Sequence, residues 1–439
     1  MQKKFTAALA MLLIVALLSA SVAAHWQGPA SIAKPDAAAL NSTDEILKIV
    51  SRLRSLDIKQ NVKSSFKTKD EIEQAVIKDL DENTPLEDFE ASQKTLMKLG
   101  LISRNFRLRD YVVSLLREQV AGFYEPKTKE FYLAAWLPIA DQKRVIAHEL
   151  VHALQDQHFD LRRFDGWPKG DSDAELAAHA LVEGEATLVM IEYDFEEQGL
   201  RLDMNKLGAL TDNMIEQDGD SDSKTYPVLA HAPKVLKENL QFPYLYGAGF
   251  VGAVLRSGTW KALDKTYISL PESTEQIMHP QRFIVRDKPV KIDIPDLTQT
   301  LGSGWKKADA DVNGEFGYLV ALAEFIPKRT ARTAAEGWGG DRYVLYENKA
   351  TSGLLLVQFT TWDTENDARE FFDAYAARTE RRYKLGKQQV AQSQSRVYET
   401  SEGLAAIELR GKDVLMIEGA QRRELLARIL EKAWQSTRK

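Results

Sequence analysis

Apolar residues recur at helical spacing along the first part of the chain. Residues 44–56 carry isoleucine, leucine and valine at intervals of three and four, the period of one helix face. Residues 68–71 (Thr-Lys-Asp-Glu) form a capping-box pattern ahead of a second apolar stretch. Further helices are expected over 86–99 and 106–119. We predict a helical region over 25–119, either a packed subdomain or an inhibitory pro-segment; the lack of a visible processing signal favours the subdomain.

The middle of the chain combines a predicted hairpin with long predicted helices. Residues 120–134 place two aromatic-rich segments around a turn with proline and charges, which predicts a β-hairpin. Residues 141–165 contain no proline or glycine and carry an apolar surface, which favours a helix. A second capping-box pattern at 172–175 opens a helix through about Glu197 that is apolar nearly all round, and such a helix is buried. Shorter helices are expected at 233–240 and 245–257.

Residues 330–439 are predicted to form a separate α+β module. Strands are expected over 342–347, 354–361, 396–400, 404–409 and 414–418, and helices over 365–381 and 421–435. This region shows no catalytic constellation, so we expect it to pack against the rest or to position substrate. The fold class predicted for the whole chain is α+β, with the candidate chemistry between residues 120 and 329.

Composition and charge limit the classes of function that the chain can have. The chain has 439 residues, 44% of them hydrophobic and 28% charged, as in ordinary globular proteins. The net charge of −6 gives no reason to expect nucleic-acid binding. Residues 1–24 combine two lysines, an apolar run and small residues, which predicts a signal peptide. Because there is no cysteine, disulfides and a thiol nucleophile are excluded. We expect a periplasmic or secreted protein with no stable membrane insertion after signal removal.

The candidate chemistry lies in residues 144–156. His148 and His152 are four residues apart, and on a helix such positions lie above one another on the same face. Their imidazole nitrogens can therefore bind a single metal ion. Glu149 follows the first histidine, where it can reach a metal-bound water and take its proton. This His-Glu-x-x-His pattern is typical of zinc hydrolases, and we expect one Zn²⁺.

Glu183 is the first candidate for a third metal ligand. It lies in the helix predicted to be buried, where a carboxylate needs a partner. His179, one turn earlier on the same face, and Glu185 are alternatives. Gly184 costs roughly 1 kcal/mol relative to alanine in a helix, and close approach between this helix and the histidine helix would explain it.

These motifs resemble those of the gluzincins, His-Glu-x-x-His metallopeptidases whose third zinc ligand is a glutamate on a following helix. Residues 148–156 look like the active-site helix of thermolysin-like enzymes, and Val-Glu183-Gly-Glu-Ala looks like the third-ligand motif of zinc aminopeptidases. Residues 243–255 are similar to the segment of those aminopeptidases that carries an oxyanion-stabilising tyrosine. Residues 273–280 and 337–342 look like segments of secreted prokaryotic gluzincin-like proteins of unassigned substrate.

The resemblance implies a mainly helical, zincin-like metallopeptidase domain over residues 120–329, with the hairpin as a small sheet edge. It implies one Zn²⁺ bound by His148, His152 and Glu183. Two features depart from the pattern. Thirty residues separate the second histidine from the glutamate, more than is usual, and Thr187 stands where some gluzincins place an aspartate. The signature of exopeptidases, Gly-x-Met-x-Asn, is absent.

The resemblance also assigns roles around the metal. Glu149 is expected to be the general base. Tyr244 is expected to stabilise the oxyanion, with Tyr246 as second choice. Asp156 is expected either to hold a ligand histidine by its second nitrogen or to cap local backbone. His279 follows the tyrosine segment and could approach substrate.

We therefore expect an exported zinc peptidase that acts on peptide or protein substrates. The alternative from another class is a catalytically silent, zinc-stabilised envelope protein that binds partners. The presence of Glu149 disfavours that alternative, because a structural zinc site needs no such carboxylate. A zinc hydrolase acting on a non-peptide bond is the third hypothesis, since resemblance of fold does not determine substrate.

Overall fold

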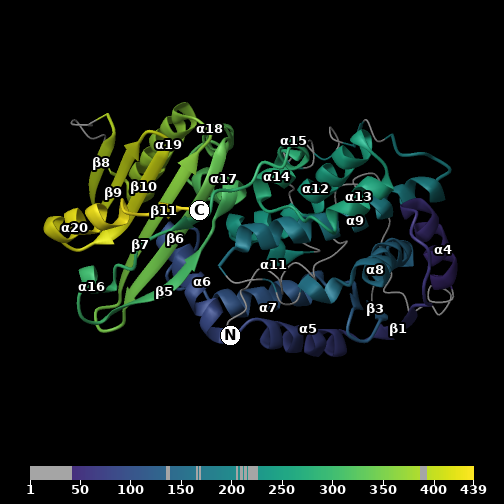
Figure 1. Cartoon of the computed structure of the whole chain (residues 1–439). Coiled ribbons are helices and arrows are strands. Elements are labelled where there is room, and N and C mark those ends of the chain that lie inside the picture. The colour runs from purple at the N-terminus through teal and green to yellow at the C-terminus, as the bar shows by residue number, and fades with distance from the viewer. Residues whose placement is uncertain are drawn as a thin grey trace.

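The computed structural model describes residues 42–134, 139–164, 167, 170–203, 206–207, 211, 215, 226–385 and 393–439. The fold is mixed α+β, with a large sheet at one end and a helical part at the other (Figure 1). The predicted signal peptide, residues 1–24, lies outside the described residues. None of the helices in the described part of the chain combines the length and the apolarity that crossing a bilayer requires.

The N-terminal region is helical as predicted, apart from one strand. Its helices are α4 (Thr43–Arg54), α5 (Lys69–Asn83), α6 (Leu86–Leu99) and α7 (Leu108–Gln119). The capping box of α5 is present, because Thr68 and Glu71 accept each other's backbone N–H groups. The prediction missed strand β1 (Lys63–Lys67). Its sequence, Lys-Ser-Ser-Phe-Lys, has a single apolar residue, and the strand exists because it pairs in parallel with a strand far along the chain.

The predicted hairpin is confirmed and lies beside the histidine helix. Strands β2 (Gly122–Glu125) and β3 (Glu130–Ala134) pair antiparallel, and the sheet order β1-β3-β2 leaves β2 at the edge. The histidine helix is α8 (Ile139–Phe159), followed by a short 3₁₀ turn, η2 (Leu161–Phe164). The buried helix is α9 (Ser172–Glu197), whose start is capped by Asp171.

One long helix replaces the two that were predicted after residue 232. After the single turn α11 (Pro227–Ala230), helix α12 (Lys234–Ser257) runs through Pro243 without a break. A proline removes only one backbone hydrogen bond, and burial of α12 against α9 outweighs that loss. The sequence predicted that Gly184 allows α9 to approach the histidine helix α8 closely. In the structure, the helix closest to Gly184 is α12. A Cβ at Gly184 would lie 2.1 Å from the carbonyl carbon of Gly247.

Short helices lead from α12 to the large sheet. They are α13 (Trp260–Thr266), α14 (Thr274–Met278), α15 (Pro280–Ile284), α16 (Thr298–Leu301), α17 (Gly314–Ala323) and α18 (Lys328–Ala335). A two-stranded ribbon, β4 (Ile292–Asp293) with β11 (Thr437–Arg438), ties the last residues to this connection.

The large sheet has six antiparallel strands in the order β5-β6-β7-β10-β9-β8. The five predicted strands are present as β6 (Trp338–Asn348), β7 (Gly353–Trp362), β8 (Ser395–Thr400), β9 (Gly403–Arg410) and β10 (Asp413–Ala420). The two predicted helices are α19 (Glu365–Tyr383) and α20 (Arg423–Ala433). Strand β5 (Trp305–Asp311) also joins the sheet, although it precedes residue 330, where the sequence placed the start of this module.

The two faces of the large sheet belong to different cores. One face packs under α19 and is continuous with the apolar core that contains α8, α9 and α12. The other face packs against α20 and α16 and forms a smaller core of its own. The helical part and the sheet therefore share one continuous interior, which extends from the hairpin to α19 (Figure 1).

Candidate metal centre

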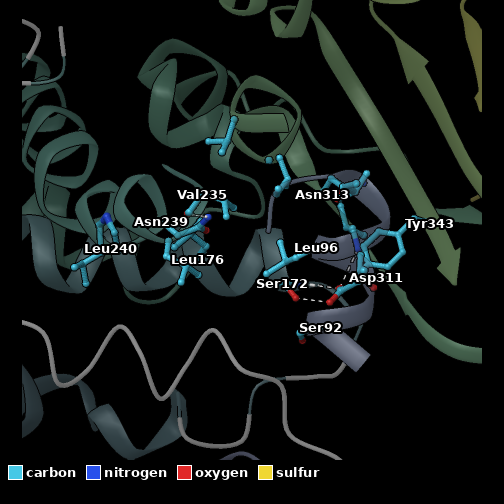
Figure 2. A pocket seen from close by; sticks show the side chains of 18 residues that line it. Ser92, Leu96, Ser172, Leu176, Val235, Asn239, Leu240, Asp311, Asn313 and Tyr343 are labelled. Carbon is cyan, nitrogen blue, oxygen red and sulfur yellow. Dashed lines mark hydrogen bonds between the residues drawn. The ribbon is translucent and has the colours of Figure 1, made fainter. Parts of the chain in front are cut away.

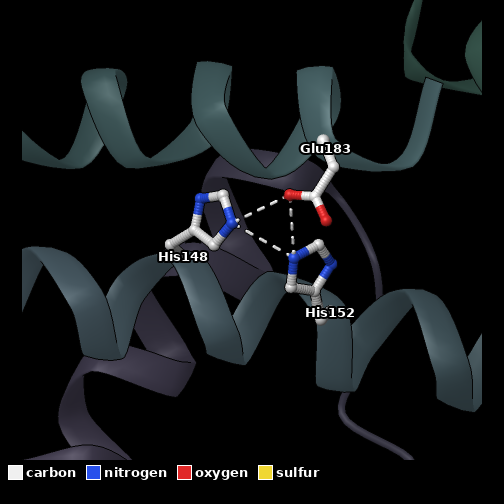
Figure 3. A group of neighbouring side chains, drawn as sticks. All are labelled: His148, His152 and Glu183. Carbon is white, nitrogen blue, oxygen red and sulfur yellow. Dashed lines mark hydrogen bonds and ion pairs between the residues drawn. The ribbon is translucent and has the colours of Figure 1, made fainter. Parts of the chain in front are cut away.

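Helices α8 and α9 bring the three predicted ligands together. His148 and His152 are one turn apart on α8, and Glu183 faces them from α9 (Figure 3). All three side chains are buried. Among the described residues, these three side chains form the one group whose donor atoms lie close enough together to hold a metal ion.

The spacing of the ligand atoms fits a tetrahedral ion. Nε2 of His148 lies 3.1 Å from Nε2 of His152, and Oε2 of Glu183 lies 3.3 and 3.4 Å from these two nitrogens. A tetrahedral zinc ion with bonds of about 2.0–2.1 Å has ligand–ligand edges of about 3.3–3.4 Å. Two imidazole nitrogens and one carboxylate oxygen, buried together, are also the donor types that zinc takes in catalytic sites.

The charges at the cluster influence one another strongly. Burial raises the pKa of the Glu183 carboxyl, but the nearby histidines outweigh burial and lower it to about 2. Burial lowers the pKa of His152, but Glu183 and then Glu149 outweigh it and raise the pKa to about 9. Glu183 is therefore ionised and ready to bind a cation.

Glu149, the predicted general base, follows His148 on α8. Its carboxylate is buried and accepts a hydrogen bond of 2.8 Å from the backbone N–H of Tyr124 on the edge strand β2. Burial raises its pKa, which the two histidines partly offset. The edge strand thus holds this carboxylate by a contact that the sequence did not reveal.

Tyr244 from α12 is the tyrosine at the site. Its ring centroid lies 6.2 Å from that of His148. Its hydroxyl is buried and has no hydrogen-bond partner among the described residues. Burial raises the pKa of Tyr244, and the charges of Glu183 and Glu149 raise it further, so the hydroxyl stays a proton donor. The second choice, Tyr246, packs instead against the aromatic ring of Phe242.

Asp156 does not hold a ligand histidine. It accepts hydrogen bonds from the Tyr124 hydroxyl at 2.9 Å and from the backbone N–H of Leu161 at 3.1 Å, and it pairs with Lys129. The local capping role, which was the other expectation, is the one that the structure shows. Asp156 follows His152 by four residues along α8, but its bonds join the hairpin to the end of this helix.

Gln155 takes the role that was expected of Asp156. Its Oε1 lies 2.8 Å from Nδ1 of His152. Sequence reasoning missed this residue, although it stands three positions after the histidine, a spacing that places side chains side by side on a helix. Nδ1 of His148 has no hydrogen-bond partner among the described residues.

The other candidates have different surroundings. Glu185 is paired with Arg54 at 2.5 Å and is not in the metal group. His279 contacts Glu315 at 2.8 Å on another part of the fold. His179 is buried on α9, and within the described part of the chain neither of its ring nitrogens has a hydrogen-bond partner. Burial lowers the pKa of His179 to about 4, so it is neutral.

A mainly apolar cavity of about 170 Å³ lies between α6, α9, α12 and β5 (Figure 2). Leu176 and Leu240 line it, and none of the three ligands does. At its rim Ser172, the first residue of α9, donates its backbone N–H to Asp311 of β5 at 2.9 Å. This contact joins the large sheet to the helix that carries Glu183.

Comparisons with known proteins concern the sheet and not the metal centre. Residues 299–429 match the sequence model of a family described as a domain of unknown function (DUF8575). The match begins just before β5 and ends within α20, so it covers the six-stranded sheet. No curated protein and no solved structure matches the chain.

Proposed function

We propose that this chain is an exported, zinc-dependent peptidase of the gluzincin type. One observation carries the proposal: three buried candidate ligand atoms with tetrahedral spacing interact electrostatically with a buried carboxylate, Glu149, and a buried tyrosine, Tyr244. A purely structural zinc site uses four protein ligands and has no need of an additional base or donor. The combination supports hydrolysis with water as nucleophile.

Each residue has a defined task in this reaction. His148, His152 and Glu183 would hold Zn²⁺, which when bound supplies Lewis acidity for water and for the substrate carbonyl. Glu149 accepts a proton from the attacking water as its oxygen bonds to the carbonyl carbon. Tyr244 donates a hydrogen bond to the oxygen that becomes negative. Glu149 then passes the proton to the amide nitrogen, and the C–N bond breaks to give a carboxylic acid and an amine.

The edge strand supports a peptide as the substrate class. Strand β2 has β3 on one side only, and Tyr124 on β2 touches the proposed base directly. An extended peptide that adds to the outer side of β2 would bring its scissile bond close to Glu149. Backbone hydrogen bonds of this kind accept many sequences, so we expect a broad cleavage preference.

The test compares wild type with Glu149→Gln. Zinc content per chain and cleavage of a mixed peptide library are measured for both proteins. We expect one zinc in each, and cleavage that falls by about 10²–10⁴-fold in the variant, because amide nitrogen and oxygen cannot accept the water proton. Zinc in both with equal cleavage would remove Glu149 from the mechanism. Zinc in both with cleavage in neither would favour a silent, zinc-stabilised binding protein.

A further inference from the structure

A continuous row of buried hydrogen bonds leads from His152 to the first described helix, α4. Gln155, which contacts His152, also donates its amide N–H to the hydroxyl of Tyr267 at 3.0 Å. That hydroxyl donates to Glu185 at 2.7 Å. Glu185 pairs with Arg54 at 2.5 Å, and neither side chain of this pair has any exposed surface. We call these four residues, Arg54, Glu185, Tyr267 and Gln155, the Arg54 chain.

The near end of the Arg54 chain determines which way the Gln155 amide lies. Its nitrogen is 2.9 Å from the backbone carbonyl of Val182, and a carbonyl can only accept. The amide oxygen is therefore the atom that faces His152, so Nδ1 of His152 must carry the proton. The opposite nitrogen, Nε2, faces His148 and Glu183. In the neutral ring Nε2 then has the free electron pair that a metal ion requires.

The far end of the Arg54 chain imposes the same polarity. A guanidinium only donates and a carboxylate only accepts, so the Tyr267 hydroxyl must give its proton to Glu185. The oxygen of Tyr267 is then left to accept from Gln155, which again places the amide nitrogen on this side. Two separate ends of one network thus select the same tautomer of His152.

We propose that the Arg54 chain positions the metal ligand His152 by holding it in the tautomer with the proton on Nδ1. These are positioning residues, since they act through the histidine and not on substrate. The proposal rests on the proposed function, because it takes the cluster to be a metal centre. Polar partners of this kind orient metal-bound histidines and raise their affinity for the metal.

The same proposal makes α4 a permanent part of the metal centre. Arg54 is the last residue of α4, and its guanidinium also pairs with Asp264 at 2.6 Å and lies 4.6 Å from the centre of the Trp260 ring. Removing α4 would leave Glu185 buried without its cation, which is strongly unfavourable. We therefore infer that residues 43–54 are not part of a removable inhibitory segment.

The affinity of the full chain for Zn²⁺ tests this role, measured by competition with a chelator. Gln155→Met keeps the length and volume of the side chain but cannot hydrogen-bond, and we expect a loss of roughly 10–100-fold in affinity. Gln155→Glu restores an acceptor for the Nδ1 proton but supplies no donor to the Val182 carbonyl, so part of the loss should be recovered. Gln358→Met is the matched control. Gln358 is also buried and donates to a tyrosine, Tyr375, at 2.7 Å, but it lies in the large sheet.

The outcomes separate this inference from the proposed function. A role in packing alone would make the buried carboxylate of Gln155→Glu at least as damaging as methionine, and that result would overturn the positioning role. Equal zinc affinity of wild type and Gln155→Met would also overturn it, while the zinc site itself would stand. A wild-type chain that binds no zinc would overturn both proposals. We expect Gln358→Met to bind zinc as wild type does, and an equal loss there would show a general effect of burying methionine.

Discussion

The large sheet and helix α19 together contain a second row of the same four residue types as the Arg54 chain. Gln358 donates to Tyr375 at 2.7 Å, Tyr375 donates to Glu418 at 2.5 Å, and Arg378 pairs with Glu418 at 2.8 Å. We call these residues the Arg378 chain. All four are buried, as they are in the Arg54 chain. The two regions therefore use one arrangement of arginine, glutamate, tyrosine and glutamine in different surroundings.

The two chains differ in what they meet at the glutamine end. The oxygen of Gln155 faces a histidine that has two tautomers, whereas the oxygen of Gln358 faces the amide of Asn313 at 3.4 Å. An amide has no proton to relocate, so the Arg378 chain can only hold elements together. Arg378 also donates to the backbone carbonyl of Leu99, so the Arg378 chain holds α6 as well. We therefore propose a positioning role for Gln155 and none for Gln358.

The chains also differ at the glutamate, and the largest expected effect follows from that. Arg54→Met should lower the free energy of unfolding by roughly 3–5 kcal/mol, because it leaves Glu185 buried without a cation. Arg378→Met should lower it less, because Glu418 keeps Arg382 at 2.5 Å. Denaturant unfolding of the two variants measures the difference. An equal or larger loss for Arg378→Met would show that the second arginine does not compensate.

Tyr244 and Tyr246 on α12 allow a proposed catalytic tyrosine to be compared with one that packs against an aromatic ring. Tyr244→Phe should lower kcat by about 10²–10³-fold with little change in KM, because it removes a donor to the developing oxyanion. Tyr246→Phe, two residues along α12, should leave kcat unchanged, because its ring packs against Phe242. The measurement is kcat and KM for peptide cleavage by wild type and both variants. Equal kcat values for wild type and Tyr244→Phe would mean that oxyanion stabilisation comes from elsewhere.

Acid should act on the Arg378 chain through Glu418. Burial raises the pKa of this carboxyl, but Arg378, Arg382 and Lys98 outweigh burial and lower it from 4.5 to about 2. A lowered pKa contributes stability above pH 4.5 that is lost as the pH falls towards 2. The contribution is at most roughly 3–4 kcal/mol, because the pKa is lowered by about 2.5 units and each unit corresponds to about 1.4 kcal/mol. The free energy of unfolding of wild type and Glu418→Gln can be measured at roughly four pH values between about 5 and about 2.5. We expect it to fall less with pH in the variant than in wild type.

Elements that depend on local pattern could be predicted from the sequence. The capping box at Thr68, the helices of the N-terminal region and the strands β6 to β10 follow from spacing and turn residues along the chain. Elements that depend on distant partners could not. Strand β1 has a single apolar residue and forms by pairing with β3, and α12 continues through Pro243 because α9 packs against it.

The residues of the candidate site also fall into those that the sequence indicated and those that only the tertiary structure showed. The sequence by itself determined that His148 and His152 share one helix face with Glu149 between them, because helical geometry sets their relation within two turns of one helix. It also indicated Glu183 and Tyr244, through the resemblance of their motifs to gluzincins. Only the tertiary structure showed that Glu183, and neither Glu185 nor His179, lies with the two histidines in the group that could hold a metal ion.

The surroundings of the ligands were decided by the tertiary structure alone. Gln155 contacts His152, whereas Asp156 bonds to the hairpin, and Arg54 reaches Glu185 from a helix 131 residues earlier in the chain. Such partners leave no trace in local spacing, because burial and hydrogen bonding act between groups that are close in space. Helical periodicity specifies which side chains share a face, whereas only packing specifies what that face meets.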